Sequence, residues 1–305
     1  MQMKVSRSEF LPLRGQRYHV RHWGRAGAPK IFMMHGWMDV SASFQFVVDC
    51  LRRDWHVIAP DWRGFGLTAG PPVDSYWFPD YLADLDAILQ HYSADAPVNL
   101  LGHSMGGYAV GLYAGTRPQR IKALINLEGF GGEHLSAELA PARYAKWLDQ
   151  LAQAAALQSY PDQAAVGARL QKTNPRLSDQ RAAFLAGNWS RQNDLGRWEI
   201  LADPAHKIIN PVLPRVEEML ACWRATTAPV LCVEAEHTNM WQWMGGKEVM
   251  RDQIDSRVAQ LPQARSAIVA DAGHMLHHDQ PQALADLIEQ FLQDESVQSG
   301  RNRTN

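Results

Sequence analysis

The sequence contains little cysteine, little net charge and no long apolar run. Its cysteines, Cys50, Cys222 and Cys232, are odd in number and lie in apolar surroundings, so we interpret them as buried thiols rather than disulfides or metal ligands. A formal net charge of −2 over 305 residues, without a basic run, argues against a nucleic-acid partner and against a membrane surface. No segment is long and apolar enough to span a membrane, and the N-terminal residues lack the apolar core of a signal peptide. A cytoplasmic location is therefore expected.

Apolar residues occur instead in short runs separated by helical patterns. With 46% hydrophobic residues, the chain can bury a large core in one domain that carries an insertion, or in two domains. Residues 5–10 and 17–23 alternate in polarity and favour an antiparallel sheet edge. Six further runs suit strands that are buried on both faces, and they lie at 30–36, 55–61, 98–104, 121–129, 229–235 and 266–273.

The segments between these runs have the spacing of amphipathic helices. Leu82, Leu85, Ile88 and Leu89 share one helix face, and the apolar residues of 284–292 share another. Strands that alternate with helices predict an α/β fold with a mostly parallel, doubly wound sheet of eight strands. In such sheets a ligand binds beyond the carboxyl ends of the strands.

One interval of about a hundred residues interrupts this alternation, because it contains no convincing buried strand. Residues 137–157 are rich in alanine and leucine, which are good helix formers. We expect a helical cap at 131–225 that covers the carboxyl edge of the sheet and excludes water from a site there. The core is then expected at 1–130 and 226–294, followed by a flexible tail at 295–305. A helical domain without a role at the site is the alternative.

A serine stands at the turn that ends one of the apolar runs. Gly102-His103-Ser104-Met105-Gly106 has the pattern Gly-x-Ser-x-Gly between a predicted strand and a helix-like pattern. A sharp strand-to-helix turn strains its central residue and brings backbone close, which glycine tolerates. The turn would expose the Ser104 hydroxyl at a helix N-terminus, where developing negative charge is favoured. The alternative is an ordinary turn with a capping serine.

Four motifs in order give this serine a context. The chain resembles the α/β-hydrolase family over nearly its whole length, through HGW at 35–37, DWRGFG at 61–66, GHSMGG at 102–107 and DAGHMLHHDQP at 271–281.

The resemblance implies specific roles for residues of these motifs. Ser104 corresponds to the family's nucleophile and His274 to its general base. The backbone N–H groups of Trp37 and Met105 correspond to the family's oxyanion hole. His35 and His103 are expected to hold loops in place by hydrogen bonds.

The acid of the triad departs from the family's commonest pattern. Many relatives carry an aspartate after the strand at 229–235, near the position of His237 or Thr238, and this chain has none there. Some members, including one branch of haloalkane dehalogenases and certain cofactor-free dioxygenases, carry it at the end of the preceding core strand, where Glu128 stands. A carboxylate there needs a partner such as a histidine N–H, so we favour Glu128 and keep Glu236 as the alternative. Glu128 could instead cap the glycine-rich loop that follows it.

Two patterns that suggest cofactors are rejected. His274, His277, His278 and Asp279 have metal-like spacing, but the hydrolase pattern at this place makes a metal site improbable. GFGLTA at 64–69 matches a dinucleotide fingerprint, yet the glycine and prolines that follow would prevent the helix which that fingerprint must open. We therefore expect neither a cofactor nor a metal.

A serine nucleophile implies an acyl-enzyme and hence an ester, thioester or related acyl substrate. Trp37, Met105 and Phe130, together with an aromatic-bearing cap, favour a small apolar or aromatic substrate. Three alternatives remain: a carbon-carbon bond hydrolase, a cofactor-independent dioxygenase, and a ligand sensor without catalysis. The sequence leaves the oligomeric state open.

Overall fold

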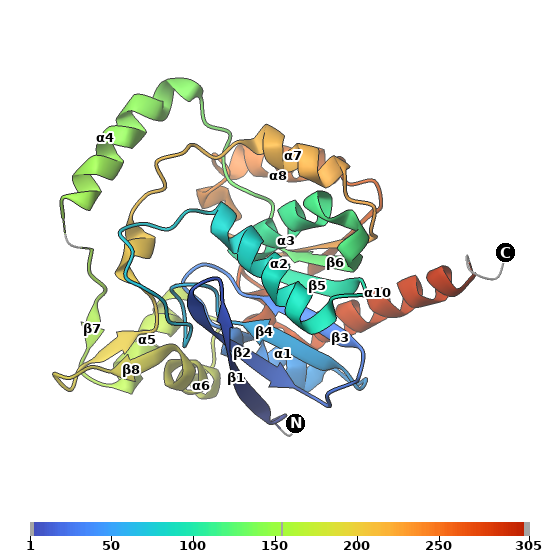
Figure 1. Ribbon diagram of the computed structural model, residues 1–305, viewed down its shortest axis with the longest axis horizontal. Helices are drawn as coiled ribbons and strands as arrows, with labels where there is room; N and C mark the ends of the chain where they lie inside the picture. The colour runs from blue at the N-terminus through green and yellow to red at the C-terminus, as the bar shows by residue number, and fades with distance from the viewer. Residues whose placement is uncertain (1–2, 154, 302–305) are drawn as a thin grey trace.

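The computed structural model describes residues 3–153 and 155–301, and it has an eight-stranded sheet at its centre (Figure 1). The strand order is β1-β2-β4-β3-β5-β6-β10-β11. β1 and β2 pair antiparallel at one edge, β2 also pairs antiparallel with β4, and the remaining neighbours are parallel. The strands are β1 (Ser6–Leu13), β2 (Gln16–Trp23), β3 (Lys30–Met34), β4 (His56–Pro60), β5 (Val98–His103), β6 (Ile121–Leu127), β10 (Val230–Ala235) and β11 (Ala264–Val269).

Helices cover both faces of the sheet, as the alternation of strands and helices predicts. One face packs against α2 (Pro79–Ser93), α3 (Met105–Thr116), α7 (Val216–Arg224) and α8 (Lys247–Val258). The other face packs against α1 (Gln45–Cys50), α9 (Leu276–Asp279) and α10 (Pro281–Arg301). Each face has its own apolar core, and every residue of β4 and β5 is buried. The predicted doubly wound α/β fold is confirmed.

The insertion between β6 and β10 contains more than helices. Its helices α4 (Ala140–Leu151), α5 (Gln163–Thr173) and α6 (Asp179–Trp189) accompany a three-stranded antiparallel sheet. Strands of two or three residues are too short to give a polarity pattern, so the sequence predicts a helical insertion only. Two small apolar clusters hold the insertion together, and Phe46 of α1 packs against the second. The strands are ordered β7-β9-β8, with β7 at Ser159–Tyr160, β8 at Ser190–Gln192 and β9 at Trp198–Ile200.

Helix α7 lies within the segment expected as cap, but it packs on the core. Trp223 and Met219 of α7 are buried in the same apolar cluster as α2 and α3. Gly115 of α3 lets the two helices approach closely, since a Cβ there would lie 1.8 Å from the carbonyl oxygen of Cys222. The part of 131–225 that packs apart from the core therefore ends before α7.

The insertion docks on the loop that follows β4. The N–H of Gly66 donates to Leu201 O at 2.7 Å, and the N–H of Asp203 donates to Gly64 O at 2.8 Å. The His206 ring stacks between Phe65 and Tyr76, with centroid distances of 3.8 and 3.7 Å. These contacts attach the insertion to the carboxyl edge of the sheet, where a ligand is expected.

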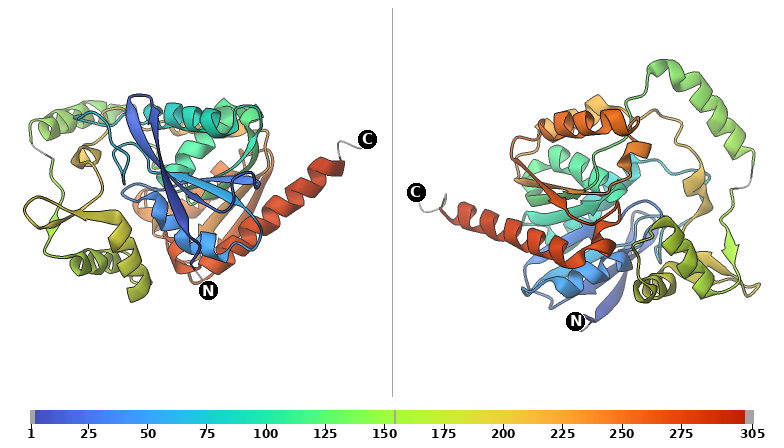
Figure 2. Two further views of the ribbon diagram at one scale, coloured as in Figure 1. Left: turned by 60° about the horizontal axis from the view of Figure 1, so that its bottom comes forward. Right: turned by 180° about the vertical axis from the view of Figure 1, so that it is seen from behind.

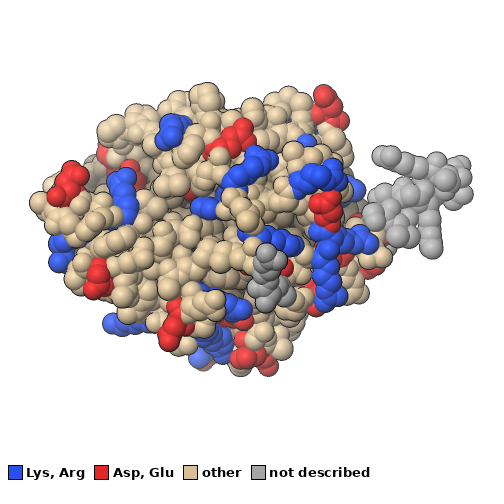
Figure 3. Space-filling view, turned by 90° about the horizontal axis from the view of Figure 1, so that it is seen from below, with Lys and Arg blue, Asp and Glu red and all other residues tan. Residues whose placement is uncertain are grey.

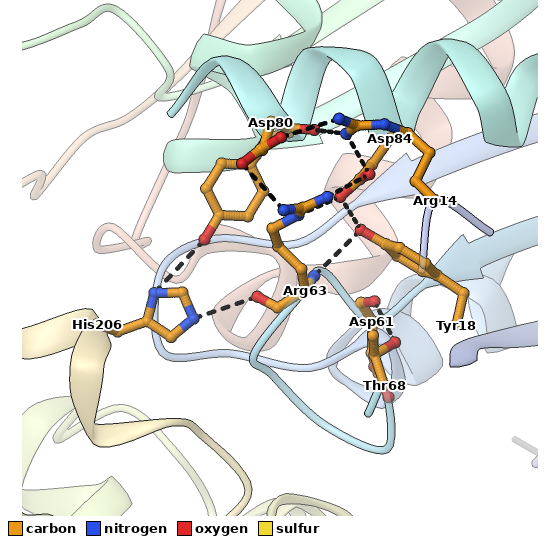
Figure 4. A network of polar contacts seen from close by, with 9 residues as sticks. Arg14, Tyr18, Asp61, Arg63, Thr68, Asp80, Asp84 and His206 are labelled. Atoms are coloured by element: carbon orange, nitrogen blue, oxygen red, sulfur yellow. Dashed lines mark hydrogen bonds and ion pairs between the residues drawn. The ribbon is translucent and has the colours of Figure 1, made fainter. Parts of the chain in front are cut away.

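A buried carboxylate also holds the loop after β4 in place. Asp84 of α2 is fully buried and accepts hydrogen bonds from Arg63 at 2.5 and 2.7 Å, from Arg14 at 2.7 Å and from Tyr18 at 2.5 Å (Figure 4). His206 joins this network because its Nε2–H donates to Arg63 O at 3.2 Å. Burial lowers the pKa of His206 to about 3, so the ring is neutral at neutral pH.

Helix α10 continues to Arg301 and extends beyond the body of the molecule (Figure 2). Helical structure thus covers most of the segment 295–305 for which a flexible tail is expected, and residues 302–305 lie outside the described residues. Within the described ranges, no helix is both long and apolar enough to span a bilayer. Figure 3 shows one face of the molecule, on which basic and acidic side chains are intermixed.

Candidate active site

Ser104 occupies the turn between β5 and α3 in a strained conformation. Its φ is 51° and its ψ is −116°, a region that residues with side chains rarely adopt. The Ser104 N–H donates to Leu127 O at 2.8 Å, which anchors the turn to the end of β6. A Cβ at Gly106 would lie 2.2 Å from Met34 O, and one at Gly102 would lie 2.4 Å from Gly106 O. The glycines are therefore required by close backbone approach, as the sequence motif suggests.

His274 lies between Ser104 and Glu128. It stands in the loop between β11 and α9, and its Nδ1 is 2.7 Å from Glu128 Oε2. A carboxylate only accepts hydrogen bonds, so Nδ1 carries the proton and Nε2 is free to accept. Nε2 lies 3.0 Å from Ser104 Oγ and accepts a hydrogen bond from its hydroxyl. Folding thus joins three residues that are far apart in sequence in one chain of hydrogen bonds.

Glu128 is held rigidly at the carboxyl end of β6. Only 1% of its surface is exposed, and its φ of 53° lies in the left-handed region. Oε1 accepts a hydrogen bond from the Ala235 N–H at 2.8 Å, and Oε2 accepts one from the Thr238 hydroxyl at 2.8 Å. The buried carboxylate therefore has partners on both oxygens, which offsets the loss of its hydration.

The other nearby carboxylates have different partners. Glu236, the alternative acid, is 52% exposed and accepts from the Asp271 N–H at 2.8 Å. Glu234 forms an ion pair with Arg251 at 2.7 Å. Asn126 caps the glycine-rich loop, because its Oδ1 accepts from the Gly129 N–H at 2.8 Å, so that role does not fall to Glu128.

Two motif histidines hold loops of the site, as expected. Burial and the neighbouring His277 and His274 imidazoles keep the pKa of His103 well below its usual range, so its ring is neutral. His103 Nε2–H donates to the backbone carbonyl of His274 at 2.8 Å, which ties the loop of the histidine to the serine turn. His35 Nε2 accepts from the Trp62 N–H at 2.9 Å and connects the loops after β3 and β4.

The residues predicted as oxyanion donors are neighbours of backbone that lies close to the serine. Met105 is the first residue of α3, and the first N–H groups of a helix have no acceptor within the helix. Trp37 follows Gly36, at which a Cβ would lie only 3.2 Å from Ser104 Cβ. The loop after β3 therefore passes directly beside the serine.

Of the three residues expected in the substrate pocket, Phe130 is placed elsewhere. Its side chain is fully buried in the larger apolar cluster of the core, so it contributes no accessible surface to a pocket. Trp37 is 54% exposed, and Met105 is partly buried against the core. Trp243 is the aromatic side chain that lies beside the histidine, since it is 51% exposed and its ring centroid lies 5.2 Å from that of His274. No sequence motif contains Trp243. The sequence offers one indication, which is that Trp243 follows β10, and the carboxyl end of β10 lies at the same sheet edge as Ser104.

The residues with metal-like spacing do not converge on one point. His277 and His278 are buried against Ser43, while Asp279 accepts from the Gly273 N–H and from Asn174. Within the described part of the chain, another group, Asp39, His103 and His277, brings potential ligand atoms within 4.8 Å of one another. The Nε2 atoms of its two imidazoles bond to the His274 carbonyl and to Ser43, whereas their Nδ1 atoms are buried without a hydrogen-bond partner.

The stretch resembling a dinucleotide fingerprint does not open a helix. Residues 64–69 form turns with isolated β-bridges at Phe65 and Ala69, and the next helix, α2, begins only at Pro79. Gly66 is required because a Cβ there would lie 2.1 Å from Asp61 Oδ2. This geometry confirms the reason for rejecting the fingerprint.

Comparison with known proteins agrees with this architecture. The sequence model of the alpha/beta hydrolase fold matches residues 29–281. The chain belongs to this family. A serine hydrolase-like protein from Danio rerio is 25% identical over 304 residues and covers 96% of this chain and 91% of its own. Serine hydrolase-like protein 2 from Homo sapiens is 25% identical, with 89% of each chain covered.

Solved structures also resemble the protein. A thioesterase domain from the curacin biosynthetic pathway has a TM-score of 0.82 and 25% identity, and covers 93% of this chain and 99% of its own. An esterase from Mycobacterium tuberculosis has a TM-score of 0.71 at 18% identity, covering 95% and 92%, which shows the fold alone.

Proposed function

We propose that this protein is a serine hydrolase that cleaves a small apolar or aromatic ester, or a related acyl compound such as a thioester, through an acyl-enzyme. The observation that carries this proposal is the continuous contact from Ser104 Oγ to His274 at 3.0 Å and from His274 to Glu128 at 2.7 Å. The similarity to serine hydrolase-like proteins and to a thioesterase domain supports it.

In this reaction His274 acts as base and then as acid. Nε2 takes the hydroxyl proton as Ser104 Oγ attacks the substrate carbonyl, and it returns that proton to the leaving alcohol or thiol when the bond to the acyl carbon breaks. Water then attacks the acyl-enzyme in the same manner and regenerates the serine. Glu128 stabilises the imidazolium that forms in each step and keeps the ring in the required tautomer.

The backbone N–H groups of Met105 and Trp37 bind the oxyanion of the tetrahedral intermediate in this proposal. The position of Met105 at the start of α3 supports the role, because the helix dipole also favours negative charge there. Exposed Trp37 and Trp243 beside the serine and histidine favour an apolar or aromatic acyl group over a sugar or a peptide.

Active-site labelling tests the activated serine. We expect a fluorophosphonate probe to label the wild-type protein, and Ser104→Ala to abolish both labelling and the hydrolysis of nitrophenyl esters, lowering kcat by a factor on the order of 10⁴ to 10⁶. A series of acyl chain lengths then defines the preferred substrate. A wild-type protein that is not labelled would contradict the proposal.

Assays with other substrates distinguish the alternative functions. Turnover of vinylogous diketones without turnover of esters would indicate a carbon-carbon bond hydrolase, and oxygen uptake that persists in Ser104→Ala would indicate a dioxygenase. Binding without any turnover would indicate a sensor. We also propose that the partner is a small-molecule substrate and that the protein acts in the cytoplasm. The three free cysteines are consistent with that reducing compartment.

A further inference from the structure

A cavity of about 400 Å³ lies away from the catalytic residues, between the β1–β2 edge, the loop after β4 and the insertion. Its wall contains the side chains of Arg17 and Arg21 from β2 and of Arg191 from β8. No aspartate or glutamate belongs to the twelve residues that line it. We propose that this cavity binds the carboxylate or phosphate group of a small molecule.

The guanidinium groups are available because their surroundings leave them unpaired. Among the described residues, none of these three arginines lies within ion-pair distance of a carboxylate. Arg17 stacks on the Phe10 ring at 3.7 Å, which orients its guanidinium without using its N–H groups. Arg21 donates to Ser6 and to Asn188, whereas its Nε is buried without a partner. A buried N–H of this kind is unfavourable unless something accepts from it.

The neutral polar side chains of the wall are already used within the protein. Thr68 donates to Asp61 O at 2.6 Å, and Ser190 donates to Ala186 O at 2.7 Å. Asn188 donates to Phe184 O at 2.9 Å, and its oxygen accepts from Arg21. The hydroxyl protons of the wall are therefore used within the protein, and the charged donors that remain are guanidinium N–H groups, which suits an oxyanion rather than a cation.

The negative charges near the wall do not cancel this field. Glu199 is the cross-strand neighbour of Arg191, but it lies beyond ion-pair distance of it and accepts a hydrogen bond from Asn193. Asp61 lies behind the loop, where it is buried and accepts from His19 and from the N–H groups of Ser41 and Leu67. The C-terminal end of α6 contributes a partial charge of about −0.5 at most, against three full positive charges. Carboxylate and phosphate both match the forked geometry of a guanidinium.

The position of the cavity distinguishes it from the catalytic site. Strand β2 is separated from β5 by β4 and β3, so three strand spacings, or about 14 Å, lie between the two strands. An anion in the cavity does not touch Ser104. Either the anion is the far end of an elongated substrate, or it is a separate molecule.

Binding of simple anions tests the proposal independently of turnover. Inorganic phosphate and butanoate are titrated by calorimetry into the wild-type and Ser104→Ala proteins at low ionic strength. We expect saturable binding of one anion by both proteins, weakened by 0.5 M NaCl because added salt screens the charges. Arg17→Gln/Arg191→Gln changes two exposed side chains and should weaken binding at least tenfold. Arg21→Gln should have a similar effect.

A matched double variant, Arg53→Gln/Lys172→Gln, removes two exposed charges outside the cavity and should bind within twofold of wild type. Comparing KM for a neutral ester with KM for an ester that carries a distal carboxylate distinguishes the two sources of the anion. A lower KM for the carboxylate ester that is lost in Arg17→Gln/Arg191→Gln would identify the substrate itself, and unchanged values would identify a separate ligand. Absence of binding at 20 mM anion, or binding that Arg17→Gln/Arg191→Gln retains within twofold, would overturn the proposal.

Discussion

The Thr238 hydroxyl donates a hydrogen bond of 2.8 Å to Glu128 Oε2, the same oxygen that lies 2.7 Å from His274 Nδ1. From the sequence, the acid of many relatives is expected near the position of His237 or Thr238. In this protein the carboxylate that contacts His274 follows β6, and the Thr238 hydroxyl donates a hydrogen bond to it.

The first prediction concerns which carboxylate serves the histidine. Glu128→Gln should lower kcat by on the order of 10² to 10⁴, because an amide neither stabilises the imidazolium nor enforces the tautomer. KM should change little. Glu236→Gln is the matched control, since Glu236 is exposed and bonds to the Asp271 N–H, and its kcat should remain within threefold of wild type. Steady-state hydrolysis of a nitrophenyl ester measures both, and the reverse result would assign the acid to Glu236.

A second prediction uses the proximity of Thr238 to move the acid. Glu128→Ala/Thr238→Asp should have a kcat at least tenfold higher than that of Glu128→Ala. The reason is that the side chain at position 238 already reaches the Glu128 carboxylate, which contacts His274. The rescue should require a carboxylate, so Glu128→Ala/Thr238→Asn serves as control. Equal kcat values for the two double variants would show that position 238 cannot serve the histidine.

The third prediction concerns the serine turn. Gly106→Ala should reduce the free energy of unfolding by about 3 kcal/mol or more, because its Cβ would meet Met34 O at 2.2 Å. At Gly132 the nearest atom to an added Cβ is 3.7 Å away, so Gly132→Ala should change stability by less than about 1 kcal/mol. Urea denaturation at neutral pH measures the difference. Similar values for the two variants would contradict the close approach at the turn.

The fourth prediction concerns the pH dependence of stability. Burial lowers the pKa of His206 to about 3 from its ordinary value of 6.5. The unfolded chain therefore binds a proton at this residue below pH 6.5 that the folded protein does not bind until about pH 3, and stability falls as the pH falls through this window. From pH 7.5 to pH 5, His206 should account for about 2 kcal/mol of the loss.

Replacement of His206 isolates this contribution. Urea unfolding at the two pH values should show a loss about 2 kcal/mol smaller in His206→Gln than in wild type. His91 is exposed, so His91→Gln should keep the wild-type pH dependence. An unchanged pH dependence in His206→Gln would mean that the ring is not held neutral between Phe65 and Tyr76.

Much of the core was accessible from the sequence because its signals are local. Continuous apolar runs predict β4 and β5, which are buried on both faces, and alternation predicts the β1–β2 edge. The glycines around Ser104 indicate a turn with close backbone contacts. The insertion was harder to predict. Its three strands have only two or three residues each, too few to show a polarity period. The packing of α7 on the core depends on the close approach of α7 to Gly115 of α3, which are far apart in sequence.

By itself, the sequence determined the alternation of strands and helices, the serine turn and the order of the motifs, because polarity periods and glycine requirements act over a few neighbouring residues. Only the tertiary structure decided which of two carboxylates meets His274, that Phe130 is buried while Trp243 borders the site, and that three arginines from β2 and β8 surround one cavity. Those outcomes depend on contacts between elements that are more than a hundred residues apart in sequence. Local sequence patterns do not predict such contacts.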